Sequence, residues 1–359
     1  MKENKTLASV LVTAVGGIVG EGIVKSLKFA NGSPAAPVHY KIYGADMNEK
    51  AAGLYRCDFG MLVPAASSPD YVDSIIKIVN ENNIRAIYVG SDLELFTIAN
   101  AKDTIEAKSD AIVFTNPVDV IVTARDKWKT YEFLNKHHLP RAASCLPEDK
   151  DQLIEKFRFP LVVKPREGYG SVHFYVVNDI RETEFAISAI QRAGWRPLIQ
   201  EYLNGDSEEY TTGVTIDRNG QYVMSSISLR KFTKSGQTYR AFVDSFDQVR
   251  KSAENIAKKL GARSAVNIQA KFDGNDAKVF EINPRFSATL PMRTVAGINE
   301  ADIVFRNSVL GEDICIKEYK RMLCLRYWNE IYVEPSAFQQ MSSLKQIAQD
   351  NRSFNIDYF

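Results

Sequence analysis

Apolar strands and amphipathic helices alternate over the first 115 residues of this 359-residue chain, and this alternation restricts the fold more than any other feature. Residues 7–15 have the unbroken apolar character of a buried strand, and a glycine-rich turn then opens a helix that runs to about residue 29. Further strands are predicted at 41–45, 60–63, 86–89 and 111–114, with a helix at 69–82. Because strands joined by helices pair in parallel, the sequence predicts a doubly wound α/β domain with ligand-binding loops at the carboxyl edge of its sheet.

The glycine-rich turn of residues 16–22 has two interpretations. Asp46 follows Gly22 by 46 − 22 = 24 positions, close to the spacing of a dinucleotide-binding fingerprint. On that interpretation a nicotinamide dinucleotide lies over the turn and Asp46 binds a ribose. The glycines, however, follow the order G-G-x-x-G-x-G instead of G-x-G-x-x-G, and a tight glycine turn also serves simply to pack a helix on a strand. Both interpretations stay open at this point.

A strand near the other end of the chain finishes in Glu281-Ile-Asn283-Pro284-Arg285. Glu281 and Asn283 are two residues apart, so their side chains point to the same face of the sheet. Pro284 cannot donate to a sheet ladder, which ends the strand and places Arg285 just beyond it. The preceding strand, joined through a turn, brings Gln269 beside Glu281. Hard oxygen ligands next to a fixed cation suit Mg²⁺ and phosphate.

Two strands around a glycine-containing turn predict a flap. Residues 159–165 form a strand that carries Lys164, and residues 172–177 form its partner. The N–H groups of such a turn can surround phosphate oxygens while the lysine neutralises their charge. An ordinary hairpin with a lysine at its edge is the alternative. The turn residues expected over the phosphates are Gly168, Gly170 and Ser171.

The strand that begins at residue 197 runs into Gln200-Glu201-Tyr202-Leu203. Backbone donors and acceptors in this segment suit the edge of an adenine ring, and Glu209 could take ribose hydroxyls. The densest basic run of the chain, residues 230–240, follows a hairpin. It is either a solvated loop or a cationic segment whose Arg230 and Arg240 face an acidic substrate or a terminal phosphate.

Composition excludes several classes of function. Forty-five Lys and Arg against 44 Asp and Glu leave a net charge of +1, so charge gives no reason to expect a nucleic acid or an anionic membrane as partner. The four Cys and four His have no zinc-type spacing, and no apolar stretch approaches about 18 residues. These features favour a soluble protein of a reducing cytoplasm.

The order of these segments resembles the ATP-grasp superfamily from about residue 116 to residue 315. The likeness is greatest to the synthetase components of the carbamoyl-phosphate synthase large chain and to the stand-alone carboxylate–amine ligases related to it. It implies an α/β fold, with a Rossmann-like pre-ATP-grasp domain followed by a two-lobed α+β ATP-grasp domain. The expected divisions are 1–115 for the first domain, 116–190 for the first lobe with its flap, 191–315 for the second lobe with the metal site, and 316–359 for C-terminal strands and a tail packed on the ATP-grasp domain.

The resemblance also implies site roles. Arg285 and Lys164 would be catalytic, acting on the transferred phosphoryl group. ATP would be held by Lys127, Lys164, Gly168, Gly170, Ser171, Gln200, Glu201, Leu203 and Glu209. Mg²⁺, with Mn²⁺ as an alternative ion, would be held by Gln269, Glu281 and Asn283. Since Gln269 stands where many family members have an acid, a second metal would be held less strongly. Substrate contacts are expected from Arg230, Arg240, Ser287 and Arg293, with Gly16, Gly17, Asp92 and Glu94 at the edge of the first domain.

The predicted activity is an ADP-forming carboxylate–amine ligase that uses ATP and Mg²⁺. Its partners would be a small-molecule acid and a small-molecule amine, and a homodimer is an open alternative to a single chain. Two other functions stay open. One is a nicotinamide-dependent oxidoreductase built on residues 1–115, and the other is a degenerate ATP-binding regulator.

Overall fold

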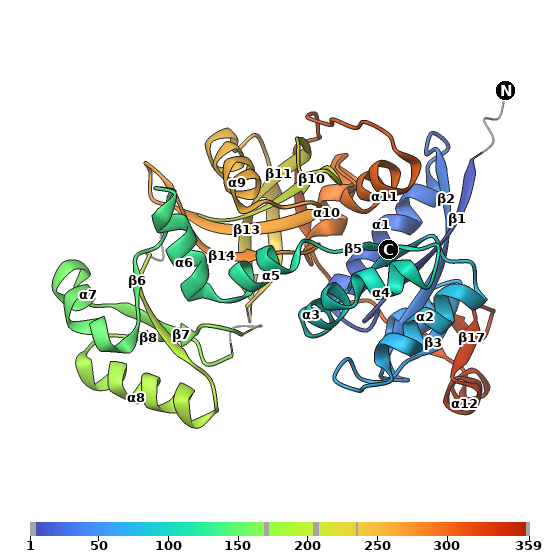
Figure 1. The fold of residues 1–359 in the computed structure, drawn as a ribbon, viewed down its shortest axis with the longest axis horizontal. Coiled ribbons are helices and arrows are strands. Elements are labelled where there is room, and N and C mark those ends of the chain that lie inside the picture. The colour runs from blue at the N-terminus through green and yellow to red at the C-terminus, as the bar shows by residue number, and fades with distance from the viewer. Residues whose placement is uncertain (1–4, 169–171, 204–207, 235, 357–359) are drawn as a thin grey trace.

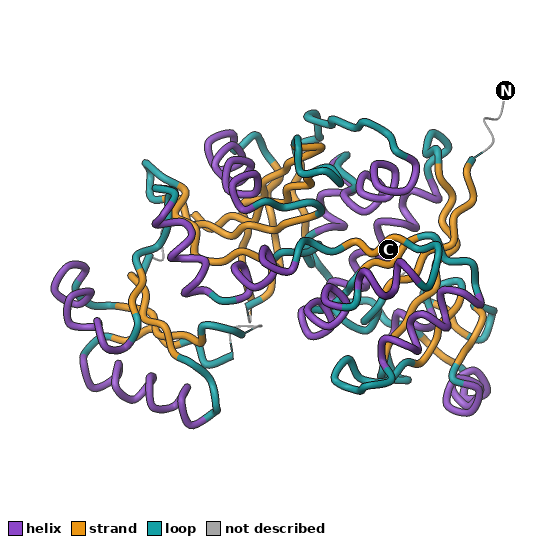
Figure 2. Tube along the Cα trace, viewed as in Figure 1, coloured by secondary structure: helices purple, strands orange, loops and turns teal. Residues whose placement is uncertain are grey.

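The computed structural model of the chain describes residues 5–168, 172–203, 208–234 and 236–356. It contains an N-terminal sheet, a small four-stranded sheet and a large six-stranded sheet, each with its own helices (Figures 1 and 2). The predicted flap residues Gly170 and Ser171 lie outside the described residues. Within those residues, no helix is long and apolar enough to cross a membrane.

The N-terminal sheet has the strand order β17-β3-β2-β1-β4-β5. Its strands β1 to β5 all pair in parallel, which confirms the predicted doubly wound domain. The strands are β1 (Thr6–Val12), β2 (Val38–Asp46), β3 (Phe59–Leu62), β4 (Ala86–Tyr88) and β5 (Ile112–Phe114). The helices are α1 (Ile18–Gly32) on one face and α2 (Tyr71–Glu81), α3 (Asp92–Asn100) and α4 (Lys102–Ala107) on the other, with a short 3-10 turn η1 (Ala52–Tyr55). Because both faces are covered, strand β1 is apolar without alternation.

The small sheet forms a separate lobe at the lower left of Figure 1, with the order β6-β9-β7-β8. It comprises β6 (Ser144–Cys145), β7 (Leu161–Pro165), β8 (Tyr175–Val177) and β9 (Pro197–Glu201), with α7 (Lys150–Phe157), α8 (Ile180–Arg192) and the turn η2 (Pro147–Asp149). Strand β9 pairs with both β6 and β7, so it belongs to this lobe. The predicted lobe boundary at residue 190 is therefore wrong.

The large sheet is antiparallel, in the order β14-β13-β10-β11-β12-β15. Its strands are β10 (Glu208–Ile216), β11 (Val223–Lys234), β12 (Gln237–Val243), β13 (Ala265–Phe272), β14 (Ala277–Asn283) and β15 (Met322–Leu325). One face is covered by α5 (Val118–Arg125), α6 (Lys127–Lys136) and α9 (Asp247–Leu260). Helices α10 (Leu290–Ala296) and α11 (Glu300–Leu310) share a core with α1 and β11, which joins this sheet to the N-terminal domain.

The segment before the small lobe forms two helices, α5 and α6, which are separated at Asp126. The Asp126 side chain accepts hydrogen bonds from the N–H groups of Trp128 and Lys129 and so caps α6. Both helices pack on the large sheet and not in the first lobe, because Val120, Ala124 and Leu134 belong to the core of that sheet.

The C-terminal tail packs partly on the first domain, which corrects the prediction that residues 316–359 pack on the ATP-grasp domain. Strand β15 does extend the large sheet, as expected. Beyond β16 (Tyr332–Val333), however, α12 (Pro335–Leu344) leads into β17 (Gln346–Ala348), which pairs with β3, and β18 (Ser353–Phe354) pairs back with β16. Met341 and Ile347 are buried in the core of the N-terminal domain, and this apolar burial holds the tail there.

A completely buried ion pair lies where α10 and α11 meet the large sheet. Arg293 donates from Nη1 to Glu300 Oε1 at 2.9 Å and from Nη2 to Thr211 and Asn267, and neither charged side chain exceeds 1% exposure. Arg293 was predicted to contact substrate, and its burial and four-residue network instead give it a structural role. Desolvation by burial raises the pKa of Glu300, although Arg293 opposes the shift.

We expect Glu300→Ala to lower the free energy of unfolding by about 3–5 kcal/mol, because it leaves the Arg293 charge buried without its partner. Urea denaturation followed by circular dichroism measures the loss. The matched control is Glu81→Ala, which removes an exposed ion pair with Lys77 and should change stability by less than about 1 kcal/mol. Equal effects of the two substitutions would contradict the assignment.

Candidate active site

The β13–β14 hairpin brings the three predicted metal ligands together. In the antiparallel register Gln269 lies directly opposite Glu281, and Asn267 lies opposite Asn283. Side chains that are opposite each other or two apart share a face of the sheet. Gln269, Glu281 and Asn283 therefore lie on one face, and all three are partly exposed. The predicted placement of Gln269 beside Glu281 is confirmed.

Lys164 on β7 is buried close to these ligands. Its ammonium donates to Gln200 Oε1 at 2.8 Å, and Gln200 in turn donates to Ser144 Oγ at 2.8 Å. Burial and the neighbouring Lys127 ammonium lower the pKa of Lys164 to about 7, while the Glu281 and Glu209 carboxylates oppose that shift. The small and large sheets thus bring two lysines and two carboxylates within electrostatic reach of one another.

Lys127 links α6 to the base of the flap. Its backbone N–H donates to Arg166 O at 3.0 Å, and its Nζ lies 3.5 Å from Gly168 O. The Arg166 guanidinium binds the Asp126 carboxylate, with Nε–Oδ1 and Nη2–Oδ2 distances of 3.1 and 2.5 Å. The capping residue of α6 therefore also fixes the start of the segment between β7 and β8. Those two strands pair as the predicted hairpin.

Arg285 joins the large sheet to the N-terminal domain. Its guanidinium makes a two-point contact with Asp92 at the start of α3, with Nε–Oδ1 and Nη2–Oδ2 distances of 2.7 and 2.5 Å, and Nη2 also donates to Asn283 Oδ1 at 3.3 Å. Burial alone would raise the pKa of Asp92, but the charge and hydrogen bonds of Arg285, together with the Arg125 and Lys127 charges, outweigh burial and lower that pKa. The arginine is thereby held beside Asn283, one of the predicted metal ligands.

Two family models match this chain. Residues 124–289 match the ATP-grasp domain, and residues 16–113 match a domain described as PylC-like, N-terminal. The chain therefore has a PylC-like N-terminal domain followed in sequence by an ATP-grasp domain.

Curated carbamoyl-phosphate synthases are similar to much of this chain. The chain is 26% identical over 321 residues to a carbamoyl-phosphate synthase from Methanobrevibacter smithii, covering 84% of this chain and 83% of that protein. It is 24% identical over 239 residues to the carbamoyl phosphate synthase large chain of Clostridium acetobutylicum, and spans only 22% of that longer protein.

Solved structures show the same fold. N5-carboxyaminoimidazole synthetase from Staphylococcus aureus, complexed with ADP, has a TM-score of 0.69 at 16% identity, over 91% of this chain and 84% of that one. Biotin carboxylase from Campylobacter jejuni, in a complex with an ATP compound, has a TM-score of 0.68 at 18% identity, over 91% and 76%. ATP-grasp homologues bind ATP or ADP with Mg²⁺, as in a biotin carboxylase domain from Hydrogenobacter thermophilus complexed with MgADP.

The segment predicted to meet adenine has its polar groups partly engaged within the ATP-grasp domain. The Glu201 N–H donates to Ala143 O at 2.8 Å, and its carboxylate accepts from Lys278 at 3.2 Å. Leu203 O accepts from Lys271 at 3.1 Å. The Glu201 side chain therefore links the two lobes, and the Glu201 N–H and the Leu203 carbonyl already have partners within the protein.

Sequence reasoning missed Lys231, which the structure places among the predicted ligands. Its ammonium lies 2.8 Å from Glu209 Oε1 and also donates to Gln269 Oε1, and its side chain is only 7% exposed. In the sequence, Lys231 was grouped with the other basic residues of the run 230–240. The alternation of side chains along a strand could have singled out Lys231. Lys231 is two residues from Leu229, so the two side chains lie on one face. Leu229 lies opposite Thr211, which in turn lies opposite Gln269, so Gln269 is on that face as well.

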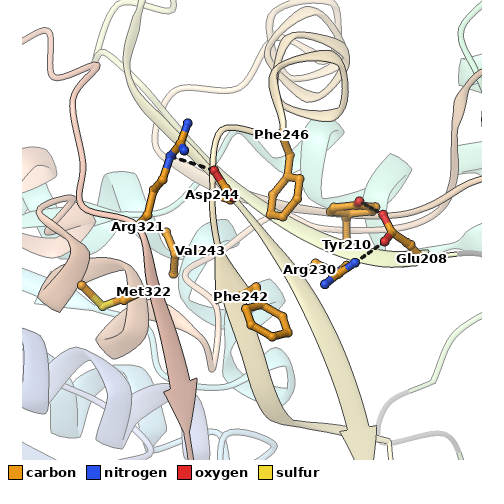
Figure 3. A pocket seen from close by; sticks show the side chains of 9 residues that line it. All are labelled: Glu208, Tyr210, Arg230, Phe242, Val243, Asp244, Phe246, Arg321 and Met322. Carbon is orange, nitrogen blue, oxygen red and sulfur yellow. Dashed lines mark hydrogen bonds and ion pairs between the residues drawn. The ribbon is translucent and has the colours of Figure 1, made fainter.

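Arg230 and Arg240 lie on the other face of the large sheet, which corrects their predicted role at the phosphate site. Arg230 lies opposite Tyr210 and Phe242. Because it is adjacent to Lys231 in the strand, its side chain points to the other face. Figure 3 shows its side chain in a separate pocket, directed at Glu208 beside Tyr210 and Phe242. Arg240 is exposed and two residues from Phe242, so it shares this second face.

The glycine turn of the first domain makes hydrogen bonds and close contacts with neighbouring residues of the same domain. Gly16 N–H and Asn48 N–H donate to the two Asp46 carboxylate oxygens at 2.8 and 2.9 Å. A Cβ at Gly20 would stand 2.2 Å from Ala14 O, too close for any other residue. The observed geometry favours the packing interpretation of this turn over the dinucleotide one.

The remaining predicted substrate residues also have internal partners. Glu94 is buried and accepts from Thr13 Oγ1 at 2.6 Å and from Tyr71 OH at 2.8 Å, and burial raises its pKa. Ser287 shares a hydrogen bond of 2.9 Å with Thr289. Among the residues proposed at the edge of the first domain, Asp92 is linked to a predicted metal ligand, because Arg285 contacts both Asp92 and Asn283.

We expect Lys164→Met to stabilise the nucleotide-free protein most at low pH. A pKa lowered to about 7 makes the folded chain bind fewer protons than the unfolded chain between pH 7 and about 10.5. Lys164 therefore lowers the free energy of unfolding by its full amount below pH 7, and this effect decreases as the pH rises towards 10.5. The stability difference between variant and wild type should shrink by about 1.4 kcal/mol per pH unit from pH 7 to pH 9.

Denaturant unfolding at each pH measures this difference. Lys77→Met, which alters a lysine with 72% of its side chain exposed, is the control and should show no such slope. A difference that is independent of pH for Lys164→Met would show that the lysine is not desolvated in the folded chain.

Proposed function

We propose that this protein is an ATP- and Mg²⁺-dependent, ADP-forming ligase that activates a substrate carboxylate as an acylphosphate for attack by an amine. One observation carries the proposal. A buried lysine on the small sheet, Lys164, lies within electrostatic reach of Glu281, which shares one face of the large sheet with Gln269 and Asn283. A nucleotide between the two lobes would place its phosphates against both. ATP-grasp enzymes are ADP-forming ligases, which supports the reaction class.

The donor set fits Mg²⁺. Glu281 supplies a carboxylate, Asn283 and Gln269 supply amide oxygens, and the three lie on one partly exposed face. Magnesium prefers such oxygen ligands and retains several waters and phosphate oxygens of its own. Within the described residues no group of three His, Cys, Asp or Glu could hold a metal, so the amides are needed to complete the set.

The chain's own side chains would divide the chemistry between them. Lys127 and Lys164 would bind phosphate oxygens, and Mg²⁺ held by Glu281 and Asn283 would supply neutralisation of the developing negative charge. A substrate carboxylate oxygen attacks the γ-phosphorus, the bond from that phosphorus to ADP breaks, and Arg285 stabilises the transferred phosphoryl group. The amine then attacks the acyl carbon, phosphate leaves, and the amine loses a proton.

The acid is proposed to enter beside Arg285 and the start of α3. The Asp92 carboxylate already satisfies two N–H groups of Arg285, so it orients the guanidinium without carrying the substrate itself. An incoming carboxylate would meet the same cation. Bicarbonate with ammonia is the smallest acid and amine pair to test, because the Methanobrevibacter relative is named carbamoyl-phosphate synthase.

We expect Glu281→Ala combined with Asn283→Ala to abolish substrate-dependent ADP release while the fold is retained. Removing both ligands leaves Mg²⁺ with Gln269 alone. A coupled ADP assay over a panel of acids and amines measures turnover, and circular dichroism checks the fold. The matched control, Asn275→Ala with Asp276→Ala, changes two exposed residues of the same hairpin and should leave turnover unchanged.

Unaltered ADP release by the Glu281/Asn283 variant would falsify the metal site. Two other results would favour the other functions. Stabilisation by reduced nicotinamide dinucleotide and not by ATP, in a thermal-shift panel with and without Mg²⁺, would favour an oxidoreductase. ATP binding without ADP release for any pair of substrates would favour a regulator.

A further inference from the structure

Lys231 is a fixed cation inside the predicted metal site. It lies on the same face of the large sheet as Gln269 and Glu281, and its aliphatic stem is buried. Its ammonium is shared between Glu209 Oε1 at 2.8 Å and Gln269 Oε1. Lys231 therefore holds a ligand predicted for the metal and a residue predicted for the ribose.

The contact between Lys231 and Gln269 affects how many Mg²⁺ ions the site can bind. Mg²⁺ bound to Gln269 Oε1 would lie about 2.1 Å from that oxygen. The ammonium bonds to the same oxygen, so the two cations would stand close together in a partly buried site, where their repulsion is weakly screened. A neutral amide cannot offset that repulsion, whereas a carboxylate could.

Glu281 and Asn283 are free of this conflict. The structure gives Lys231 no contact with either of them among the described residues, and Asn283 is directed towards Arg285. A single Mg²⁺ can therefore bind at the Glu281 and Asn283 end of the hairpin. The Gln269 end already carries a positive charge.

We propose that Lys231 takes the electrostatic place of a second divalent cation, so that the site binds one metal for each nucleotide. This inference rests on the proposed function, because it concerns the same nucleotide site. Lys231 is a positioning residue on this assignment. It orients Glu209 and Gln269 and supplies a permanent charge that needs no metal.

The test counts Mn²⁺ ions. The protein is mixed with one equivalent of a non-hydrolysable ATP analogue and titrated with Mn²⁺, while electron paramagnetic resonance follows the free ion. We expect the wild type to bind one Mn²⁺ per chain. The double variant Lys231→Met with Gln269→Glu removes the cation and adds a carboxylate, and it should bind two.

Lys234→Met is the matched control, because it makes the same change at an exposed lysine of the same strand, and it should still bind one ion. Two ions in the wild type, or one in the double variant with its fold intact, would overturn the role of Lys231. Absence of any nucleotide-dependent Mn²⁺ binding by the wild type would instead reject the proposed function itself. The two failures are therefore distinguishable.

Discussion

The register of the large antiparallel sheet is the constraint on which the candidate site depends. Pairing of β13 with β14 sets Gln269 opposite Glu281, and pairing of β10 with β13 adds Glu209 and Thr211 to the same face. A slip of one residue would turn every one of these side chains to the other face. The core under α5, α6 and α9 prevents that slip, because the intervening apolar residues must stay buried.

The first domain contributes to the site through the way it is fixed to this sheet. A single apolar core runs from α1 through α10 and α11 to β11. The buried pair of Arg293 and Glu300 lies in the same junction. This packing brings the start of α3 close enough for Asp92 to hold Arg285. The N-terminal domain thus positions a residue of the ATP-grasp domain, independently of the role of its glycine turn.

The small lobe is attached differently. It has its own core, and polar contacts join it to the large sheet, such as those of Glu201 with Lys278 and of Leu203 with Lys271. Polar contacts at such a joint can be remade at little cost, whereas an apolar core cannot. In the proposed reaction, closure of this lobe over a nucleotide would exclude water from the acylphosphate.

The sequence by itself determined the five parallel strands of the first domain and the pairing of Gln269 with Glu281, because local periodicity and turn residues specify these features. It could not separate Lys231 from Arg230, since adjacent residues of a strand differ only in the face they take, and pairing with distant strands sets that face. It also could not find the bond between Asp92 and Arg285, or the burial of Arg293, because both depend on domain packing. The tail shows the same limit: its apolar residues were visible, but only the tertiary structure decided that they cover the first domain.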